Sequence, residues 1–292
     1  MSFSFQTIMK KIIIVGIDFS NCSFQALDYA IMIAEKTSSN ILMVWVGKGK
    51  DLPSIYIPQV IDPRHEVKKQ FEELIEKHKD KLSKSKLMYK IRNGKVYKEI
   101  VNQAKYHDAF LIVTGSHGVS GFEEFWIGSN ANKIVTYAPC PVITVAYNMK
   151  KKMKLNKIIL PIDNTRQTRQ KVPFSCYLAK FFDAEIHIVG LYSSKVKSLR
   201  NIVDRYVNQV TKQLDKLEIK YKKISLDAEN VTHTTIEYAK ENGGDLIAIM
   251  TEQETKTSNI LLGPYAQQMV NHSKTPVLSI HTRYIYDYKL ET

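Results

Sequence analysis

The sequence has few of the residues that build disulfide frameworks and metal sites. Its 292 residues include three cysteines, Cys22, Cys140 and Cys176, which lie far apart and show no paired spacing. This scarcity is typical of a reducing compartment, and it argues against a zinc site because such sites use closely spaced pairs of ligands. We expect each cysteine to be a small buried or helix-face residue, and we expect no protein metal site.

Long apolar runs are also missing. No run approaches the roughly 20 residues that a helix needs to cross a bilayer. The segment from Met1 to Met9 has no positively charged region, and the apolar run that follows it is too short for a signal peptide. We therefore expect a protein of the cytoplasm with no membrane partner.

Acidic residues are too few to balance the basic ones, 29 against 42, so the formal charge is +13. Such an excess attracts nucleotides, nucleic acids and anionic membranes without specificity. However, lysines alternate with glutamates in amphipathic stretches such as 66–81, where a solvated helix face is indicated. We expect no nucleic-acid partner, because the chain has no RNA-recognition aromatic set, zinc-finger spacing or recognition helix.

The chain also lacks two well-known nucleotide-binding sequences. It has neither a Walker sequence GxxxxGK[ST] nor a GxGxxG after a strand. Apart from Asp18, no acidic residues suggest a metal-holding role, because we interpret the pair Glu123-Glu124 as solubilising loop residues. His117 has no partner visible in the sequence. Because efficient phosphoryl transfer needs a metal holder and a positioned base, we expect a binding protein and not an enzyme, with hydrolysis at most slow and incidental.

What the chain does contain is a regular alternation of buried strands and amphipathic helices. Apolar runs predict strands at 11–17, 41–46, 87–91, 109–113 and 142–147, and helical periodicity fills most of the intervals. The resulting order, βαβαβαβαβ, predicts an α/β fold with a parallel sheet covered by helices on both faces.

This order begins again after a lysine-rich linker. Asp163 follows its strand as Asp18 does, 145 residues later, and the strand at 245–250 repeats the fourth strand 135 residues later. The ten-residue loss falls after the second strand, so the counterpart of the long 47–63 connection is shortened. The repeat predicts two domains, 9–148 and 154–284.

A glycine-rich stretch follows the fourth strand of the first copy. It contains Gly115, Gly118 and Gly128, and Ser129 then begins a predicted helix that ends at Tyr137. Glycine lets main-chain N–H groups approach a bulky anion, and a helix N-terminus carries unpaired donors and a partial positive charge. The layout therefore predicts a phosphate cradle.

The spacing of this stretch, Gly-x2-Gly-x9-Gly-Ser, resembles that of nucleotide-binding members of the universal stress protein family, the UspA-like proteins. The resemblance covers roughly residues 11–280 in two copies. It implies two tandem, doubly wound, five-stranded parallel-sheet domains of the adenine nucleotide alpha-hydrolase-like type, with strand order 3-2-1-4-5. In such a sheet ligands bind between strands one and four, where Asp18 and Thr114-Gly115 would meet.

The resemblance also implies a ligand, ATP with or without Mg²⁺, and a role for each matching residue. Asp18 would contact the adenosine, Val46 the adenine, and Thr114 and Gly115 would line the nucleoside. The phosphates would be held by main-chain N–H groups and a serine hydroxyl, from Gly118, Gly128, Ser129 and Asn130. Helix capping is an alternative role for Asp18 and Ser129.

The second copy departs from this pattern. Met250, Gln253 and Pro264 stand where the first copy has Gly115, Gly118 and Ser129, while Gly263 matches Gly128. Side chains at 250 and 253 would occupy the space that phosphates need, and proline removes one N–H donor. We expect the second half not to bind ATP in the manner of the family.

These features predict an adenine-nucleotide-binding stress protein that acts as a sensor or regulator, with nucleotide held by the first domain. The alternative is an interaction module of the same fold that binds no nucleotide, or that binds another small anionic ligand. The last strands, from Val142 to Tyr147 and from Val277 to Ile280, would expose unpaired edges, so we expect them to pair within the chain as a pseudo-dimer. Pairing of whole chains into a homodimer stays open.

Overall fold

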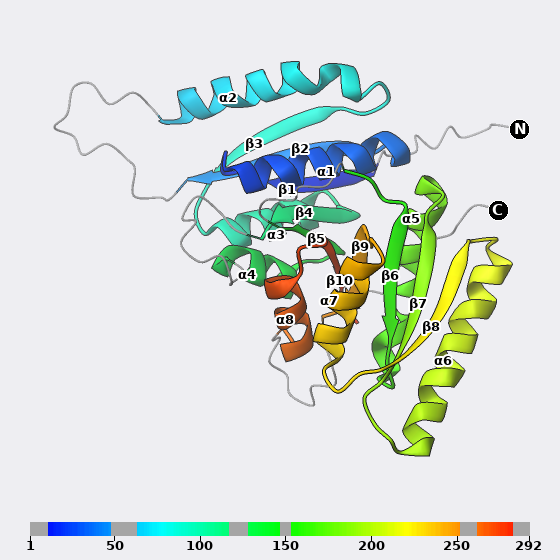
Figure 1. The fold of residues 1–292 in the computed structure, drawn as a ribbon. Coiled ribbons are helices and arrows are strands. Elements are labelled where there is room, and N and C mark those ends of the chain that lie inside the picture. The colour runs from blue at the N-terminus through cyan, green and yellow to red at the C-terminus, as the bar shows by residue number, and fades with distance from the viewer. Residues whose placement is uncertain (1–10, 48–62, 117–127, 147–152, 252–261, 283–292) are drawn as a thin grey trace, which may run out of the picture.

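The computed structural model describes residues 11–47, 63–116, 128–146, 153–251 and 262–282, which fold into two similar halves (Figure 1). The first half contains β1 (Ile12–Gly16), α1 (Asn21–Thr37), β2 (Asn40–Gly47), α2 (Pro63–His78), the 3₁₀ helix η1 (Lys79–Lys81), β3 (Leu87–Asn93), α3 (Val96–Tyr106), β4 (Leu111–Gly115), α4 (Ser129–Tyr137) and β5 (Val142–Val145).

The second half repeats this order. It contains β6 (Lys157–Ile162), the 3₁₀ helix η2 (Arg166–Arg169), α5 (Val172–Phe182), β7 (Glu185–Tyr192), α6 (Lys197–Lys216), β8 (Tyr221–Asp227), α7 (Val231–Glu241), β9 (Leu246–Met250), α8 (Pro264–His272) and β10 (Val277–Ile280). The connection from β7 to α6 is short, in agreement with the predicted deletion, while most of its counterpart, 48–62, lies outside the described residues.

The strands form one ten-stranded sheet in the order β3-β2-β1-β4-β5-β10-β9-β6-β7-β8. Each half has the order 3-2-1-4-5 with parallel neighbours, as the resemblance implied. The two halves do not form separate sheets. Strands β5 and β10 pair antiparallel and join the two five-stranded parts into one sheet.

Two predicted boundaries shift for local reasons. The amphipathic stretch 66–81, where a helix face is indicated, is α-helical only to His78 and continues as η1 to Lys81. The strand expected over 109–113 begins at Leu111, because Asp108 adopts a positive φ of 46° and the Ala109 N–H donates to the Ala104 carbonyl, which closes α3. The strand then continues to Gly115.

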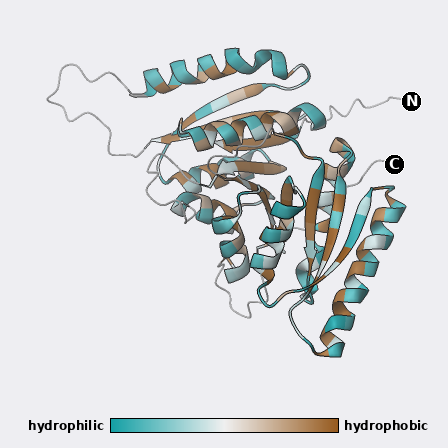
Figure 2. Ribbon diagram, in the orientation of Figure 1, coloured by the Kyte–Doolittle hydropathy of each residue, from teal (hydrophilic) through white to brown (hydrophobic). Residues whose placement is uncertain are grey.

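Alternate residues along each strand point to opposite faces of the sheet, and this sorts the core into layers. On one face, residues such as Ile13 and Ile158 join a single apolar cluster that runs under α1, α2, α5 and α6 of both halves. On the other face, Ile14 packs under α3 and α4, and Ile159 packs under α7 and α8. Figure 2 shows the inner strands mostly in brown, the outer strands in mixed colours, and α6 with both teal and brown along its length.

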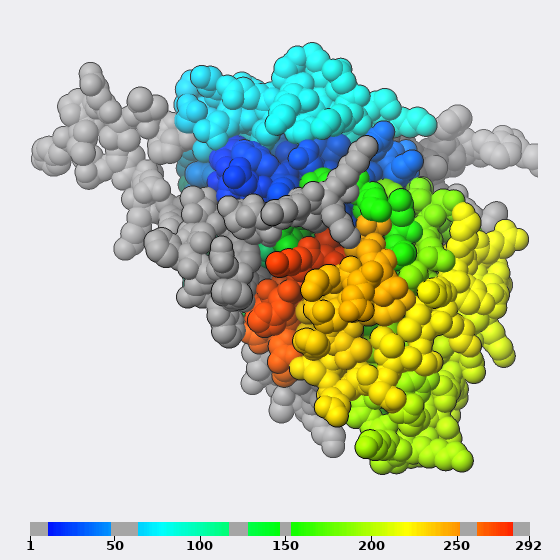
Figure 3. Space-filling view, viewed as in Figure 1, coloured from blue at the N-terminus to red at the C-terminus, as the bar shows by residue number. Residues whose placement is uncertain are grey.

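The two halves lie against each other in the space-filling view, where the colour runs from blue to green in the first half and from green to red in the second (Figure 3). At the sheet, Leu278 of β10 pairs with Ile143 of β5, and both side chains are fully buried. Tyr147, which was expected to extend β5, lies outside the described residues.

An aromatic cluster closes one side of this junction. Phe110, which precedes β4, lies 6.4 Å from Phe174 and 6.2 Å from Tyr177 of α5, measured between ring centroids. The Lys11 ammonium donates to the Tyr177 hydroxyl at 3.1 Å and lies over the Tyr177 ring. Because these groups come from both halves, apolar packing as well as strand pairing holds the halves together.

We predict that Phe110→Ala lowers the free energy of unfolding by about 3 kcal/mol, because it leaves a cavity between the halves. Phe181→Ala is the matched control, since Phe181 contacts the same cluster through Tyr177 but its side chain is 41% exposed. Urea unfolding of both variants measures the difference. Equal losses for the two substitutions would contradict the assignment of Phe110 to a buried junction.

Candidate functional site

The strand order places one switch point in each half, where neighbouring strands lead to opposite sides of the sheet. In the first half β1 and β4 pair through Ile13–Leu111, Ile14–Ile112 and Val15–Val113. Asp18 and Ser116, which follow these strands, therefore leave the sheet at the same edge. We call this edge the first switch point, and in open α/β sheets it is where ligands bind.

Asp18 braces the turn from β1 into α1. Its Oδ1 accepts the Ser20 N–H at 3.0 Å and the Ser20 hydroxyl at 2.6 Å. Ser20, not Asp18, is the N-cap of α1, because its hydroxyl oxygen accepts the Ser23 N–H. The capping alternative for Asp18 is therefore wrong in detail. Phe19 adopts a φ of 60°, which is uncommon for a bulky residue and marks a constrained turn at this edge.

Gly115 is required by packing within the protein. A Cβ atom built on it would lie 2.7 Å from the Cys22 Sγ and 3.1 Å from the Cys22 carbonyl carbon. Glycine thus lets the first turn of α1 approach the end of β4. Thr114 is buried beside it, and Val46 lies half-buried at the end of β2 on the face covered by α3.

The N-terminus of α4 completes the first switch point. The Gly128 N–H donates to the Ser116 carbonyl at 2.7 Å, while the predicted contact of Gly128 with a phosphate stays a prediction. Ser129 and Asn130 are exposed, and among the described residues no side chain caps α4. The N–H groups of this first turn have no acceptor within the helix itself. Gly118 and His117 lie outside the described residues.

The second switch point lies between β6 and β9. It repeats the backbone hydrogen bonds of the first switch point, but side chains leave only a small cavity there. Asp163 Oδ1 accepts the Thr165 N–H and hydroxyl at 2.9 and 2.6 Å, and the Gly263 N–H donates to the Thr251 carbonyl. Here, however, the remaining cavity measures about 10 Å³. It is lined by Pro161, Asp163, Thr165, Thr168, Lys171, Met250 and Tyr265.

Lys171 fills much of this second switch point. Its side chain is buried, and its ammonium donates to the carbonyl and hydroxyl oxygens of Thr168 at 2.6 and 3.1 Å. Burial lowers the pKa of Lys171 to about 8, against the opposing attraction of Asp163. Ligand pockets usually measure roughly 300 Å³ or more, so the cavity among these described residues is far smaller than a typical ligand pocket.

The loss of one glycine explains why the second half differs. Met250 occupies the position of Gly115, and a side chain there would meet the helix start that Gly115 admits in the first half. In the second half the matching turns form η2, and the α-helix proper begins only at Val172. Met250 itself is 4% exposed and lines the small cavity.

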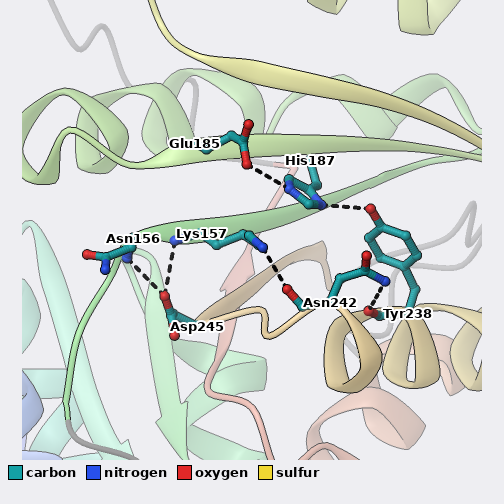
Figure 4. Close-up of polar contacts among 7 residues, drawn as sticks. All are labelled: Asn156, Lys157, Glu185, His187, Tyr238, Asn242 and Asp245. Carbon is teal, nitrogen blue, oxygen red and sulfur yellow. Dashed lines mark hydrogen bonds and ion pairs between the residues drawn. The ribbon is translucent and has the colours of Figure 1, made fainter.

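A buried polar chain at the opposite, amino-terminal edge was not anticipated from the sequence (Figure 4). The His187 Nδ1 lies 2.7 Å from the Tyr238 hydroxyl, and its Nε2 lies 2.9 Å from Glu185 Oε2. Nearby, Asp245 Oδ2 accepts the N–H groups of Asn156 and Lys157, which ties β9 to β6. The one sequence signal was a histidine within the apolar strand β7. These contacts join β7 to α7 at the edge opposite the switch points.

The described residues hold neither a metal cluster nor a membrane-spanning helix. Within them no cluster of three or more histidine, cysteine, aspartate or glutamate residues could hold a metal ion. No helix in the same part of the chain has the length and apolar character to span a bilayer. Cys22, Cys140 and Cys176 are all buried, as expected from their spacing, and none of the three is part of a disulfide.

Sheet order, duplication and the two switch points define the class: a tandem, doubly wound α/β protein. Comparison with known proteins specifies it further. A model of the universal stress protein family matches residues 9–146 and 154–281, so the chain belongs to this family.

Curated relatives resemble one half at a time. The chain is 32% identical to universal stress protein YxiE of Bacillus subtilis over 142 residues, which are 45% of this chain and 96% of that protein. It is 30% identical to universal stress protein MJ0531 of Methanocaldococcus jannaschii over 143 residues, which are 47% of this chain and 82% of that protein.

Solved structures match the whole fold. A universal stress protein from Archaeoglobus fulgidus superposes with a TM-score of 0.69 at 15% identity, covering 94% of this chain and 99% of that chain. A functionally unknown protein from Pseudomonas aeruginosa gives a TM-score of 0.68 at 15% identity, with coverage of 94% and 93%. At this identity the likeness shows the shared fold of both halves.

The buried His187 generates a pH prediction. Burial lowers the pKa of His187, although its hydrogen bond to Glu185 opposes the shift. Below about pH 6.5 His187 therefore binds a proton in the unfolded chain but not in the folded chain. As the pH falls, the free energy of unfolding decreases by at most about 1.4 kcal/mol per pH unit for this group.

His187→Gln should flatten this fall between about pH 6.5 and 5, as measured by urea unfolding at several pH values. Part of the slope remains, since burial also lowers the pKa of His78 and His107. His233→Gln, at an exposed position of α7, is the control and should leave the slope as it is. An unchanged slope in His187→Gln would show that His187 is not the titrating group.

Proposed function

We propose that this protein is an adenine-nucleotide-binding universal stress protein that acts as a sensor or regulator in the cytoplasm. ATP, with or without Mg²⁺, is held by the first domain, 9–148, and the second domain, 154–284, holds none. The observation that supports this best is the contrast between the switch points. The second is filled by Lys171, Met250 and Tyr265, whereas the first carries Gly115. The helices α4 and α8 both begin after a glycine without a side-chain cap, so the difference lies in the residues around the helix start.

In this proposal each described residue of the first switch point has a chemical task. Val46 offers an apolar contact to the adenine at the end of β2, and Asp18, Thr114 and Gly115 line the nucleoside. The N–H groups of Ser129 and Asn130 and the Ser129 hydroxyl donate to the phosphates, because an uncapped helix N-terminus attracts anions. The Gly118 N–H also donates to the phosphates. Gly128 has no side chain, so the phosphates can approach the backbone there.

The protein acts by binding, and any hydrolysis is slow and incidental. Asp18 is engaged with the Ser20 N–H and hydroxyl, so it is arranged as a fixed acceptor in the turn before α1. The degenerate second domain serves as a built-in partner. Its β10 pairs with β5 at the edge that would otherwise stay open, which makes the chain a covalent pseudo-dimer.

The direct test is isothermal titration of ATP into the full chain, together with mass spectrometry of the freshly purified, denatured protein. We expect one ATP site per chain. No heat and no thermal shift with ATP would overturn the proposal and favour the interaction module, or a different small anion as ligand.

A matched pair of glycine substitutions assigns the site. Gly128 has a φ of −56° and Gly263 a φ of −60°, so both backbones accept any L-residue. We predict that Gly128→Val weakens ATP binding by about 100-fold or more, which is the loss of several hydrogen bonds to a charged group. Gly263→Val should leave ATP affinity within about twofold of the parent protein, because the second half holds no nucleotide. Equal losses in the two variants would contradict first-domain binding.

A further inference from the structure

Helix α4 is held at both ends, but by different halves of the chain. At its N-terminus the Gly128 N–H donates to Ser116 of the first half. At its C-terminus the Val135 carbonyl accepts a hydrogen bond from the His281 Nε2 at 2.6 Å, and His281 follows β10 of the second half. The helix that opens the proposed phosphate site is thus anchored by a residue 146 positions away.

Val135 needs an external donor for a reason visible in its sequence. In an α-helix its carbonyl would accept the N–H of the residue four positions later, but that residue is Pro139, which has none. An unpaired buried carbonyl costs free energy. His281 supplies the missing donor.

The His281 ring is held in a defined orientation. Its side chain is buried, and its Nδ1 lies 2.9 Å from the Thr251 hydroxyl at the end of β9. Because a carbonyl oxygen only accepts, Nε2 carries the proton, and Nδ1 accepts from the Thr251 hydroxyl. Thr251 is itself fixed, since its N–H donates to the Ile280 carbonyl and its carbonyl accepts the Gly263 N–H.

Apolar contacts join the same elements. Leu262, just before α8, packs against the apolar clusters of both halves, and Ala131 of α4 belongs to the second-half cluster. In Figure 1, α4 and α8 accordingly lie side by side. Both the N-terminal and the C-terminal turn of α4 therefore contact the second half.

The first half has no counterpart of the hydrogen bond from His281 to Val135. The 135-residue offset places Ala146 at the position of His281, and an alanine side chain cannot donate. The same offset places Val270 at the position of Val135, and four residues later stands Lys274, which has an N–H. The second half thus holds a helix of the first, without a reciprocal bond.

We propose that His281 is a positioning residue through which the second half sets the placement of α4 and hence the ATP affinity of the first switch point. This inference rests on the proposed function, because it concerns the same site. It gives the degenerate domain a regulatory task. Anything that changes the contact between β10 and α4 changes nucleotide binding, and nucleotide in turn strengthens that contact by linkage.

The test compares three full-length variants. His281→Ala removes the donor, His281→Gln places an amide N–H near the position of Nε2, and His272→Ala changes an exposed histidine of α8 as the control. Hydrogen exchange of the α4 amides without nucleotide reports the contact, and titration with ATP reports its effect on the site.

We expect His281→Ala to speed exchange in α4 and to weaken ATP binding by about tenfold, within the usual range of coupling between sites. His281→Gln should recover most of both properties, and His272→Ala should alter neither. Unchanged exchange in His281→Ala, or faster exchange with unaltered ATP affinity, would overturn the inference. If the parent protein binds no ATP, the proposed function fails and this regulation with it, while the exchange data still report whether His281 holds α4.

Discussion

The antiparallel pairing of β5 with β10 is the constraint on which the rest of the structure depends. It converts two parallel sheets into one sheet of ten strands and leaves only β3 and β8 as edges among the described strands. Because the apolar cluster under α1, α2, α5 and α6 crosses this junction without interruption, the halves share one core on that face. Neither half can move without opening buried surface and strand hydrogen bonds.

On the other face the cores of the halves stay separate, and α4 lies where they meet. Its side chains contribute to both clusters, with Ile134 in the first and Ala131 in the second. A helix in this place therefore contacts the cores of both halves.

The two switch points show how a duplicated site diverges while the fold is kept. The Asp–Ser/Thr turn after the first strand and the glycine amide at the later helix start are present in both halves. Met250 in place of Gly115 goes with a displaced helix start, and Lys171 then fills the space. A buried ammonium is costly unless its donors are satisfied, and Thr168 provides two acceptors.

The sequence by itself determined the fold class, the order of elements, the duplication and the positions of the switch points. Buried parallel strands read as short apolar runs, and the amphipathic helices between them have their own period, so these features are local. Some residues have roles that depend on partners far away in the sequence, and only the tertiary structure shows these roles. Gly115 is explained by Cys22, and Gly128 by Ser116. The pairing of Val135 with His281 arises only when β10 brings the second half against α4.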